Sequence, residues 1–560
     1  MSQWDAGDDV IIIGSGVSGL TAAIAASSAG LSPRVYEASK EWGGTSAMSV
    51  GGVWIPNNHL MASGGTPDSV EEAMEYLQNV IGDAGPASST ERRLAYVNSA
   101  APMVRQLEGL GFQWRRASRW PDYHSDLNGA KLGRVLEGAL FDLRRLGATA
   151  ETMRKPETLP PIPLQGGDIA DLVVATRSLR GLQAGAQTAA RAIQGLVRNQ
   201  RLVGLGQSLM GQLGLICQQL GVSIQRNAAL RELIEADGRI QGVVIEQGGR
   251  LRRVYARYGV VLAGGGFSRN DEMRRQYGPV GSEWSAAIPG DMGDILMAGL
   301  KVGAATANME GAWWVPIVMP PNGNRDFLVW ERSLPGSVVV DQSGSRFANE
   351  SADYTTFAQN MLNNDKFVPT VPAWLIIDSR HRRRYMFGGT PGGYTPRSWI
   401  KSGYMIKAKS LEDLARRCGL PPEAVRSTVN RFNEQARRGV DEDFGRGKSL
   451  YDNYFGDPSH KPNPNLGPLE RPPFYAVQLW PGDVGTSGGL LTDEHARVIH
   501  ESGDAIEGLY AAGNSTASVM GLRYPGPGIT LGAGSVFGYI AGQHLAASAG
   551  LVPPSVSARA

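Results

Sequence analysis

A glycine-rich turn near the N-terminus constrains the fold of this chain more than any other feature. Residues 10–13 form a β-branched run, residues 14–19 read GSGVSG, and residues 20–26 favour a helix. In such a strand–turn–helix unit the glycines permit a tight turn, a close approach to a pyrophosphate and close packing of helix on strand. An acid about 20 residues further on accepts hydrogen bonds from ribose hydroxyls. The sequence therefore predicts a Rossmann-like α/β domain that binds a dinucleotide. Its expected contacts are Gly14, Ser15, Gly16, Ser18, Gly19 and Glu37.

Three further glycine-rich segments follow in a fixed order. Residues 43–46 read GGTS, residues 260–266 read VVLAGGG, and residues 508–514 read GLYAAGN. Glycine turns after strands are common singly, but this series resembles the flavoprotein superfamily of fumarate reductase and succinate dehydrogenase. The resemblance implies FAD, with a helix that starts near residue 532 and faces the flavin. The contacts that it implies are Gly43, Gly44, Thr45, Ser46, Gly264, Gly265, Gly513, Asn514 and Gly532.

The mode of FAD attachment follows from the same resemblance. Covalent members of that superfamily attach flavin through a histidine near the second glycine pair, and residues 38–58 contain no histidine. We therefore expect noncovalent FAD. No second complete dinucleotide fingerprint follows a strand elsewhere, so a tightly bound NAD is not expected.

Composition excludes several other classes of protein. The 560 residues carry a net charge of only +2, so no nucleic-acid partner is expected. Two cysteines and seven histidines without close metal-ligand spacing predict neither a disulfide framework nor a metal site. The N-terminus carries Asp5, Asp8 and Asp9 instead of a basic start and a long apolar run, which indicates a reducing, cytoplasmic setting.

The positions of the glycine motifs predict a discontinuous FAD domain. Its first part covers residues 1–290 and its return segment covers residues 475–560, with an α+β catalytic domain inserted at residues 291–474. Within the insertion, residues 337–340 and 374–377 read as strands by their β-branched content. Residues 411–437 read as helix, interrupted by Pro421 and Pro422.

Two segments bear on membrane contact. Residues 526–552 contain no Asp, Glu, Lys or Arg; their length admits a spanning helix, but their glycines and the Gln543-His544 pair favour a buried, ligand-facing helix. Residues 167–206 predict a basic amphipathic helix or helix pair beside leucines. It is either an ordinary packed surface helix or an interfacial anchor on the inner face of a membrane. Its arginines are Arg177, Arg180, Arg191, Arg198 and Arg201.

The most specific motif is YPGPG at residues 524–528, between the last glycine turn and the final helix. It resembles the 3-ketosteroid 1-dehydrogenases, and the resemblance covers nearly the whole chain except residues 167–206. It implies that the Tyr524 hydroxyl and the Gly528 N–H bind the steroid 3-carbonyl. Two donors on one oxygen form an oxyanion hole for the enolate-like charge that develops when carbon 2 loses a proton.

The same resemblance implies roles for two more tyrosines. Residues 345–354 read SRFANESADY, which implies that Tyr354 takes the proton from carbon 2. A tyrosine of ordinary pKa is mostly neutral at pH 7, so it acts as tyrosinate or through a relay. Tyr123 matches a third, supporting tyrosine. The chain contains 17 tyrosines, and a buried tyrosine is usually a packed aromatic with a satisfied hydroxyl.

The resemblance implies FAD-dependent 1,2-dehydrogenation of 3-ketosteroids, including side-chain-bearing sterol ketones such as cholest-4-en-3-one. Flavin N5 accepts hydride from carbon 1, and a quinone or another acceptor reoxidises the cofactor. Three alternatives stay open: a 3-ketosteroid 4-dehydrogenase acting on 5α-steroids, a fumarate-reductase-type enzyme, and a noncatalytic flavoprotein. A dicarboxylate site calls for convergent Arg and His side chains, whereas the tyrosines and the neighbouring Trp313 and Trp314 favour a flat apolar substrate.

Overall fold

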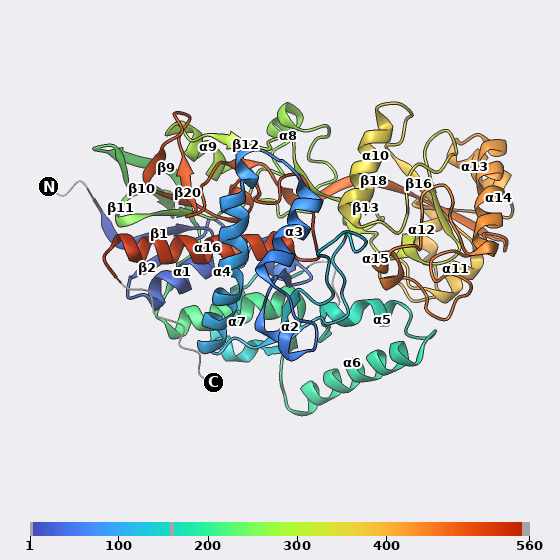
Figure 1. Ribbon diagram of the computed structural model, residues 1–560, viewed down its shortest axis with the longest axis horizontal. Helices are drawn as coiled ribbons and strands as arrows, with labels where there is room; N and C mark the ends of the chain where they lie inside the picture. The colour runs from blue at the N-terminus through green and yellow to red at the C-terminus, as the bar shows by residue number, and fades with distance from the viewer. Residues whose placement is uncertain (1–3, 157–161, 552–560) are drawn as a thin grey trace.

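Two β-sheets organise the chain and lie toward opposite ends of an elongated molecule (Figure 1). The computed structural model describes residues 4–156 and 162–551. Strands from the N-terminal, middle and C-terminal thirds of the chain share the first sheet, while the second sheet comes from the segment between them. The fold class predicted from the sequence is confirmed.

The first sheet has eight strands in the order β20-β21-β10-β11-β1-β2-β8, with β9 paired to β10. Strand β1 pairs in parallel with β2 and β11, and β21 pairs in parallel with β11. The C-terminal segment therefore returns to the sheet that the N-terminus begins. The strands are β1 (Ala6–Ile13), β2 (Pro33–Tyr36), β8 (Ser223–Gln225), β9 (Ala228–Ala236), β10 (Arg239–Gln247), β11 (Arg250–Leu262), β20 (Arg497–Ile499) and β21 (Ala505–Ala511).

Alternate side chains of β1 enter two different cores, as the period of a strand requires. Val10 and Ile12 pack with the helices on one face, whereas Ile11 and Ile13 pack with β9, β10 and the helix α9 (Asp294–Lys301) on the other. All four are at most 4% exposed. The helices of the first face are α1 (Val17–Ser28), α4 (Thr90–Gly109), α7 (Leu205–Gln219) and α16 (Ile529–Ser548).

The charge-free stretch near the C-terminus forms α16, which packs on α1. A Cβ at Gly534 would lie 2.5 Å from the Ser18 hydroxyl, and one at Gly538 would lie 2.3 Å from the Ser18 carbonyl oxygen. Glycine at this spacing lets the two helices approach closely. The expected buried helix is confirmed, and no helix of the described residues has the length and hydropathy of a membrane span. Val552, at the end of the stretch, lies outside the described residues.

The second sheet has six strands in the order β14-β13-β18-β16-β15, with β17 paired to β18. The predicted strands at 337–340 and 374–377 are confirmed, and the predicted helix over 411–437 is divided before the proline pair, as expected. The elements are β13 (Ala312–Val318), β14 (Asp326–Phe327), β15 (Ser337–Val340), β16 (Ala373–Ile377), β17 (Met405–Ala408), β18 (Phe474–Thr486), α10 (Tyr354–Asp365), α13 (Leu411–Cys418) and α14 (Pro422–Arg438).

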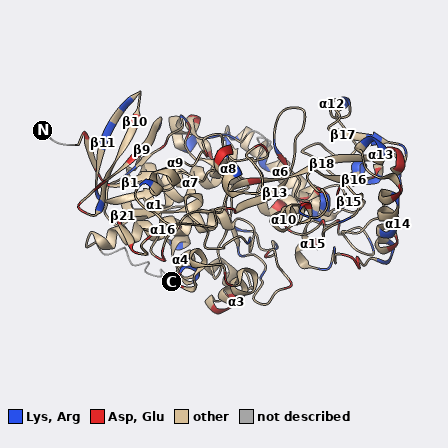
Figure 2. Ribbon diagram, turned by 90° about the horizontal axis from the view of Figure 1, so that it is seen from above, with Lys and Arg blue, Asp and Glu red and all other residues tan. Residues whose placement is uncertain are grey.

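Strand β18 begins at Phe474, where the predicted catalytic domain ends, and it pairs with β13, β16 and β17 of the second sheet. Its last residue contacts the part of the chain that forms the first sheet, because the Thr486 hydroxyl accepts a hydrogen bond from the Phe267 N–H. The exact domain boundaries at 290 and 474 stay predictions. Figure 2 shows basic and acidic residues dispersed over the whole molecule, in line with the small net charge.

The predicted amphipathic segment forms α5 (Ile169–Val173) and α6 (Leu179–Val197), and α6 runs along the lower edge of the molecule (Figure 1). The expected basic face is wrong in part, because three of its arginines are paired with acids, two of which lie outside residues 167–206. The pairs are Arg177 with Asp457 (3.5 Å), Arg191 with Asp168 (3.0 Å) and Arg201 with Glu151. Helical periodicity within one segment cannot reveal such partners.

The apolar face of α6 is instead the unusual feature, because it faces solvent. Gly181, Ala184, Thr188 and Gly195 are the residues that the helix buries. The large apolar side chains remain outside: Leu179 (86% exposed), Leu182 (56%), Ile193 (62%), Leu196 (79%) and Val197 (82%).

Candidate active site

The glycines of the first turn lie where only glycine fits. Gly14 has φ +103°, and a Cβ there would lie 2.3 Å from the carbonyl oxygen of Ala263 on the neighbouring strand. A Cβ at Gly19 would lie 2.0 Å from the Gly14 carbonyl oxygen. The N-cap of α1 is Gly16, which has no side chain, and no acid lies in the first turn, so the N–H groups that remain free there are oriented for an anion.

The second glycine pair wraps around the same helix start. The Val17 N–H donates to the Ser46 hydroxyl (3.1 Å), and the Gly43 N–H donates to the Ser15 hydroxyl (3.0 Å). The Ser15 hydroxyl in turn donates to the Glu37 carboxylate (2.6 Å). The structure thus brings together residues that the sequence predicted from separate motifs. Glu37 braces the loop through this hydrogen bond, and its contact with ribose stays a prediction.

The third and fourth glycine turns meet α1 and α16 beside Ser18. A Cβ at Gly513 would lie 2.4 Å from the Ser18 hydroxyl, so the turn lies directly on α1. Gly264 and Gly265 end β11 next to it, and their missing side chains make room for Ile295 and Asp291. Gly532 packs against the main chain of Trp54 instead, since a Cβ there would lie 2.7 Å from the Trp54 carbonyl oxygen.

A cavity lies between the last glycine turn and the start of α16. Gly513, Asn514 and Gly534 line one part of it, and Trp313 and Thr530 line another. The Trp313 indole N–H donates to the Asn514 side-chain oxygen (3.1 Å), which fixes the two walls to each other. A narrow cavity framed by glycines and by an aromatic side chain fits a flat ring system, so the residues present fit FAD.

Three predicted tyrosines converge beside this cavity although they are far apart in the sequence. The ring centroids of Tyr123 and Tyr354 are 5.5 Å apart, those of Tyr123 and Tyr524 are 5.4 Å apart, and those of Tyr354 and Tyr524 are 5.3 Å apart. The Thr530 hydroxyl, which lines the cavity, donates to the Tyr524 hydroxyl (3.1 Å). One hydrogen bond therefore connects the tyrosine cluster to the cavity wall.

Burial sets the protonation of these tyrosines. It raises the pKa of Tyr354 well above its ordinary value, and the neighbouring Tyr524 raises this pKa further while Tyr123 lowers it. Burial also raises the pKa of Tyr524, against hydrogen bonds from Thr530 and Tyr354 that lower it. Both phenols are therefore neutral near pH 7. A neutral Tyr524 keeps its own proton available for a substrate oxygen.

The turn at residues 524–528 presents a second free donor next to Tyr524. Gly528 has φ +83°, and a Cβ there would lie 2.1 Å from the carbonyl oxygen of Gly52. Within residues 4–156 and 162–551, the Gly528 N–H has no hydrogen-bond acceptor. A free N–H and a phenol held at one turn form the donor pair that an oxyanion hole requires.

Comparison with known proteins decides the family. The model of the FAD binding domain family matches residues 9–531. A 3-oxosteroid 1-dehydrogenase of Mycolicibacterium smegmatis is 40% identical over 97% of this chain and 97% of its own length. This chain belongs to the 3-oxosteroid 1-dehydrogenase family. It is an FAD-binding oxidoreductase.

Two more similarities define its place in the 3-oxosteroid 1-dehydrogenase family. A crystal structure of the 3-ketosteroid Δ1-dehydrogenase of Sterolibacterium denitrificans with 1,4-androstadiene-3,17-dione matches with a TM-score of 0.92 and 37% identity, over 97% of this chain and 100% of that one. A 4-oxocyclohexanecarboxylate 2-dehydrogenase of Sinomonas cyclohexanicum is 35% identical over 97% of this chain and 93% of its own length.

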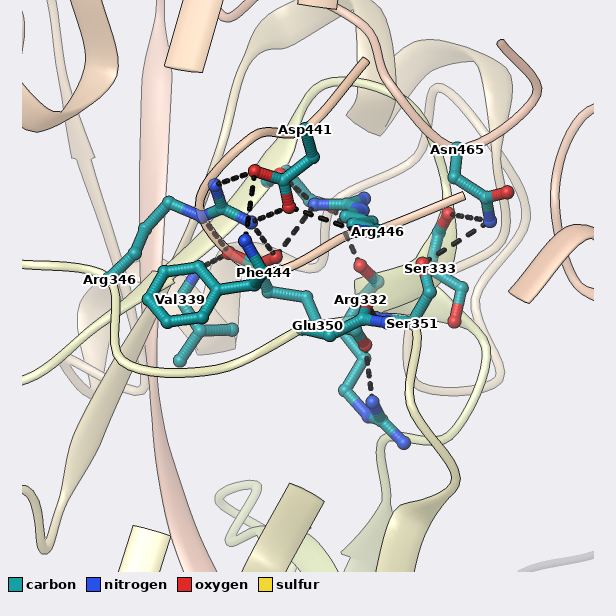
Figure 3. Close-up of polar contacts among 12 residues, drawn as sticks. Arg332, Ser333, Val339, Arg346, Glu350, Ser351, Asp441, Phe444, Arg446 and Asn465 are labelled. Atoms are coloured by element: carbon teal, nitrogen blue, oxygen red, sulfur yellow. Dashed lines mark hydrogen bonds and ion pairs between the residues drawn. The ribbon is translucent and has the colours of Figure 1, made fainter. Parts of the chain in front are cut away.

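In this family member a buried charge cluster braces the motif that precedes Tyr354 (Figure 3). Arg346 binds both Glu350 oxygens (2.7 Å each) and the Asp441 carboxylate, while Arg446 lies 3.4 Å from Glu350. Arg332 donates to the Glu350 carbonyl oxygen. Tyr354 follows as the first residue of α10, which the Asp353 side chain caps. The charge cluster therefore fixes the position of Tyr354 at the start of α10.

Two residues near the tyrosines were not found from the sequence. The Tyr451 ring lies 4.8 Å from that of Tyr123, and Thr530 hydrogen-bonds Tyr524. Trp313 meets Tyr524 edge-on at 5.2 Å, as expected of an aromatic neighbour, whereas Trp314 faces the other side of β13, under the Arg274 guanidinium. Strand alternation at 313–314 would have separated the two tryptophans; no signal in the sequence singled out Tyr451 among 17 tyrosines.

Proposed function

We propose that this chain introduces the 1,2 double bond into 3-ketosteroids, using Tyr524, Gly528, Tyr354 and Tyr123. The convergence of three tyrosines at one end of the cavity carries the proposal, because an ordinary dinucleotide-binding fold does not require it. The similarity to Δ1-dehydrogenases over the whole chain favours the 1,2 position over the alternative 4-dehydrogenation of 5α-steroids.

Tyr524 and Gly528 bind the 3-carbonyl oxygen. The phenol donates its O–H and the backbone donates its N–H, and both donors are set before substrate arrives. As carbon 2 loses its proton, negative charge moves onto the carbonyl oxygen, and both hydrogen bonds strengthen. Preorganised donors at developing charge account for much of the rate enhancement of enzymes of this kind.

Tyr354 takes the carbon-2 proton, and Tyr123 makes this possible. Burial raises the pKa of Tyr354, so the phenol must lose its own proton before it can act as the base. Tyr123 is the neighbour that lowers this pKa, and its ring contacts both Tyr354 and Tyr451. Tyr123 therefore stabilises the tyrosinate form of Tyr354, which takes the carbon-2 proton and becomes the neutral phenol again.

FAD supplies the hydride acceptor for carbon 1 when it is bound, and its electrons pass on to a quinone or another acceptor. Residues 14–19, 43–46 and 513–514 hold it noncovalently. The first histidine after the second glycine pair, His59, supports this, because its Nε2 contacts the Glu108 carboxylate at 3.0 Å.

The exposed apolar face of α6 contacts a lipid bilayer, from which sterol ketones with long side chains reach the enzyme. Five large apolar side chains on one exposed helix are more than a water-facing helix needs. Only Arg180 and Arg198 of the five arginines lack an acidic partner among the described residues, so attachment is mainly apolar and its salt dependence is small.

The test is anaerobic reduction of the bound flavin, followed by its absorbance. A 4-en-3-one steroid should bleach it, whereas a saturated 5α-steroid ketone, 4-oxocyclohexanecarboxylate and succinate should act at least ten times more slowly. Faster reduction by the 5α-steroid would identify a 4-dehydrogenase, and faster reduction by either carboxylate would refute the steroid assignment.

A further inference from the structure

Four buried side chains hold the 524–528 turn. We call them the turn-holding cluster; they are Trp54, Tyr76, Asp122 and Arg134, and none of them lines the cavity. Two hydrogen bonds fix the middle of the turn, because the Tyr76 hydroxyl (2.5 Å) and the Tyr123 N–H (3.0 Å) both donate to the Pro525 carbonyl oxygen.

Trp54 holds the glycines of the turn. Its backbone N–H donates to the Gly528 carbonyl oxygen (3.3 Å), and its indole lies so close to Gly526 that a Cβ there would be 2.4 Å from Nε1. The Trp54 indole therefore sets the position of the 524–528 turn. Trp54 is fully buried and stacks on the Tyr96 ring at 6.1 Å.

Asp122 orients that indole. Its Oδ1 accepts the hydrogen bond of Trp54 Nε1 (2.7 Å), and its Oδ2 accepts from Arg134 Nη1 (2.7 Å) and from the Lys131 N–H (3.0 Å). Arg134 is fully buried and binds Asp68 with its other two nitrogens at 2.8 Å each. Asp122 also directly precedes Tyr123, so one carboxylate constrains two parts of the tyrosine cluster.

We propose that Asp122 is a positioning residue that sets the carbonyl-binding donors Tyr524 and Gly528 through the Trp54 indole. This inference rests on the proposed function. A buried ion pair contributes little net stability, since the cost of desolvating both charges offsets their attraction, but it fixes geometry. Oxyanion donors are effective only at the place where charge develops, so their support acts mainly on the transition state.

The test compares Trp54→Phe and Asp122→Asn with the control Asp68→Asn. Trp54→Phe keeps a buried aromatic ring and removes only the indole N–H. Asp122→Asn removes the charge that faces both Trp54 and Arg134. Asp68→Asn removes the other carboxylate on Arg134 and leaves the Trp54–Asp122 hydrogen bond in place. FAD content and the thermal midpoint of each holoenzyme show whether it is folded.

For Trp54→Phe and Asp122→Asn, kcat with a 4-en-3-one steroid should fall about 10- to 100-fold, the cost of a misplaced reacting group. The Kd of 1,4-androstadiene-3,17-dione, read from the flavin absorbance, should change less than about threefold, because ground-state contacts with the ring system remain. Asp68→Asn should lower the thermal midpoint about as much as Asp122→Asn does, because each substitution removes one carboxylate from Arg134. It should nevertheless keep kcat within about threefold.

Two results would overturn the inference: kcat within threefold of wild type in Trp54→Phe, or equal loss of kcat in all three variants, which would indicate a general loss of stability. Trp54→Phe decides the matter if Asp122→Asn does not fold. An inactive wild-type holoenzyme would instead refute the proposed function, and the inference with it.

Discussion

Replacing Tyr524 with phenylalanine removes one atom from the proposed site. The ring keeps its contacts with Tyr123, Tyr354 and Trp313, whose centroids lie 5.4, 5.3 and 5.2 Å away. The hydroxyl that would bind the substrate carbonyl is lost, and Thr530 loses its acceptor. The substitution therefore separates hydrogen bonding from packing.

Tyr524→Phe should have two separate effects, one on folding stability and one on kcat. Loss of the single buried hydrogen bond to Thr530 should reduce the free energy of unfolding by about 1 kcal/mol. Loss of one oxyanion donor should lower kcat by about 10²- to 10³-fold, or about 3–4 kcal/mol of transition-state stabilisation. The remaining Gly528 N–H keeps the residual activity above zero.

The assay is steady-state turnover of a 4-en-3-one steroid with an artificial electron acceptor, next to thermal unfolding. Tyr510→Phe is the matched control, because Tyr510 is also buried and also makes one side-chain hydrogen bond, to His544 (2.9 Å). It should lose similar stability and keep its kcat. A Tyr524→Phe enzyme with less than about fivefold loss of kcat would show that its hydroxyl does not bind developing charge.

Further predictions concern the base, the cofactor and α6. Tyr354→Phe should lower kcat by about two to four decades and leave steroid binding intact; normal turnover would remove Tyr354 from the mechanism. Because burial raises the pKa of Tyr354, its deprotonated form gains population as pH rises, so wild-type kcat should climb without a plateau up to about pH 10; a plateau near neutral pH would contradict this. Acid precipitation should release all FAD into the supernatant, and flavin retained by the polypeptide would refute noncovalent attachment. The double variant Leu182→Asp/Leu196→Asp should no longer co-sediment with anionic liposomes, whereas Phe367→Asp, at an exposed apolar residue outside α6, should bind as wild type does; no binding by the wild type would leave α6 an ordinary surface helix.

Local signals sufficed for most of the fold. The glycine turns follow strands because backbone conformation and close approach demand glycine there, so Gly14 and Gly19 could be found from spacing and Gly513 from the resemblance. The charge-free helix α16 was predicted as buried because its glycines and the Gln543-His544 pair make it weakly apolar for a membrane span. The pairing of the α6 arginines could not be predicted, because Asp457 and Glu151 come from distant segments.

The residues of the candidate site also form two groups: those that a local motif predicts and those that it does not. Tyr354, Tyr524 and Gly528 stand in short motifs and could be chosen by resemblance, and the structure places the tyrosine rings together. Tyr451 and Thr530 depend on which segments meet in space, and no local pattern marks them. The turn-holding cluster is also a tertiary feature, since Trp54 and Asp122 are 68 residues apart.

The position of the new double bond tests the central claim most directly. A single anaerobic turnover of a 4-en-3-one steroid, with the product analysed by proton NMR, should give a 1,4-dien-3-one and one reduced FAD per double bond formed. Unchanged steroid beside fully oxidised FAD, or desaturation at any position other than carbons 1 and 2, would contradict the account.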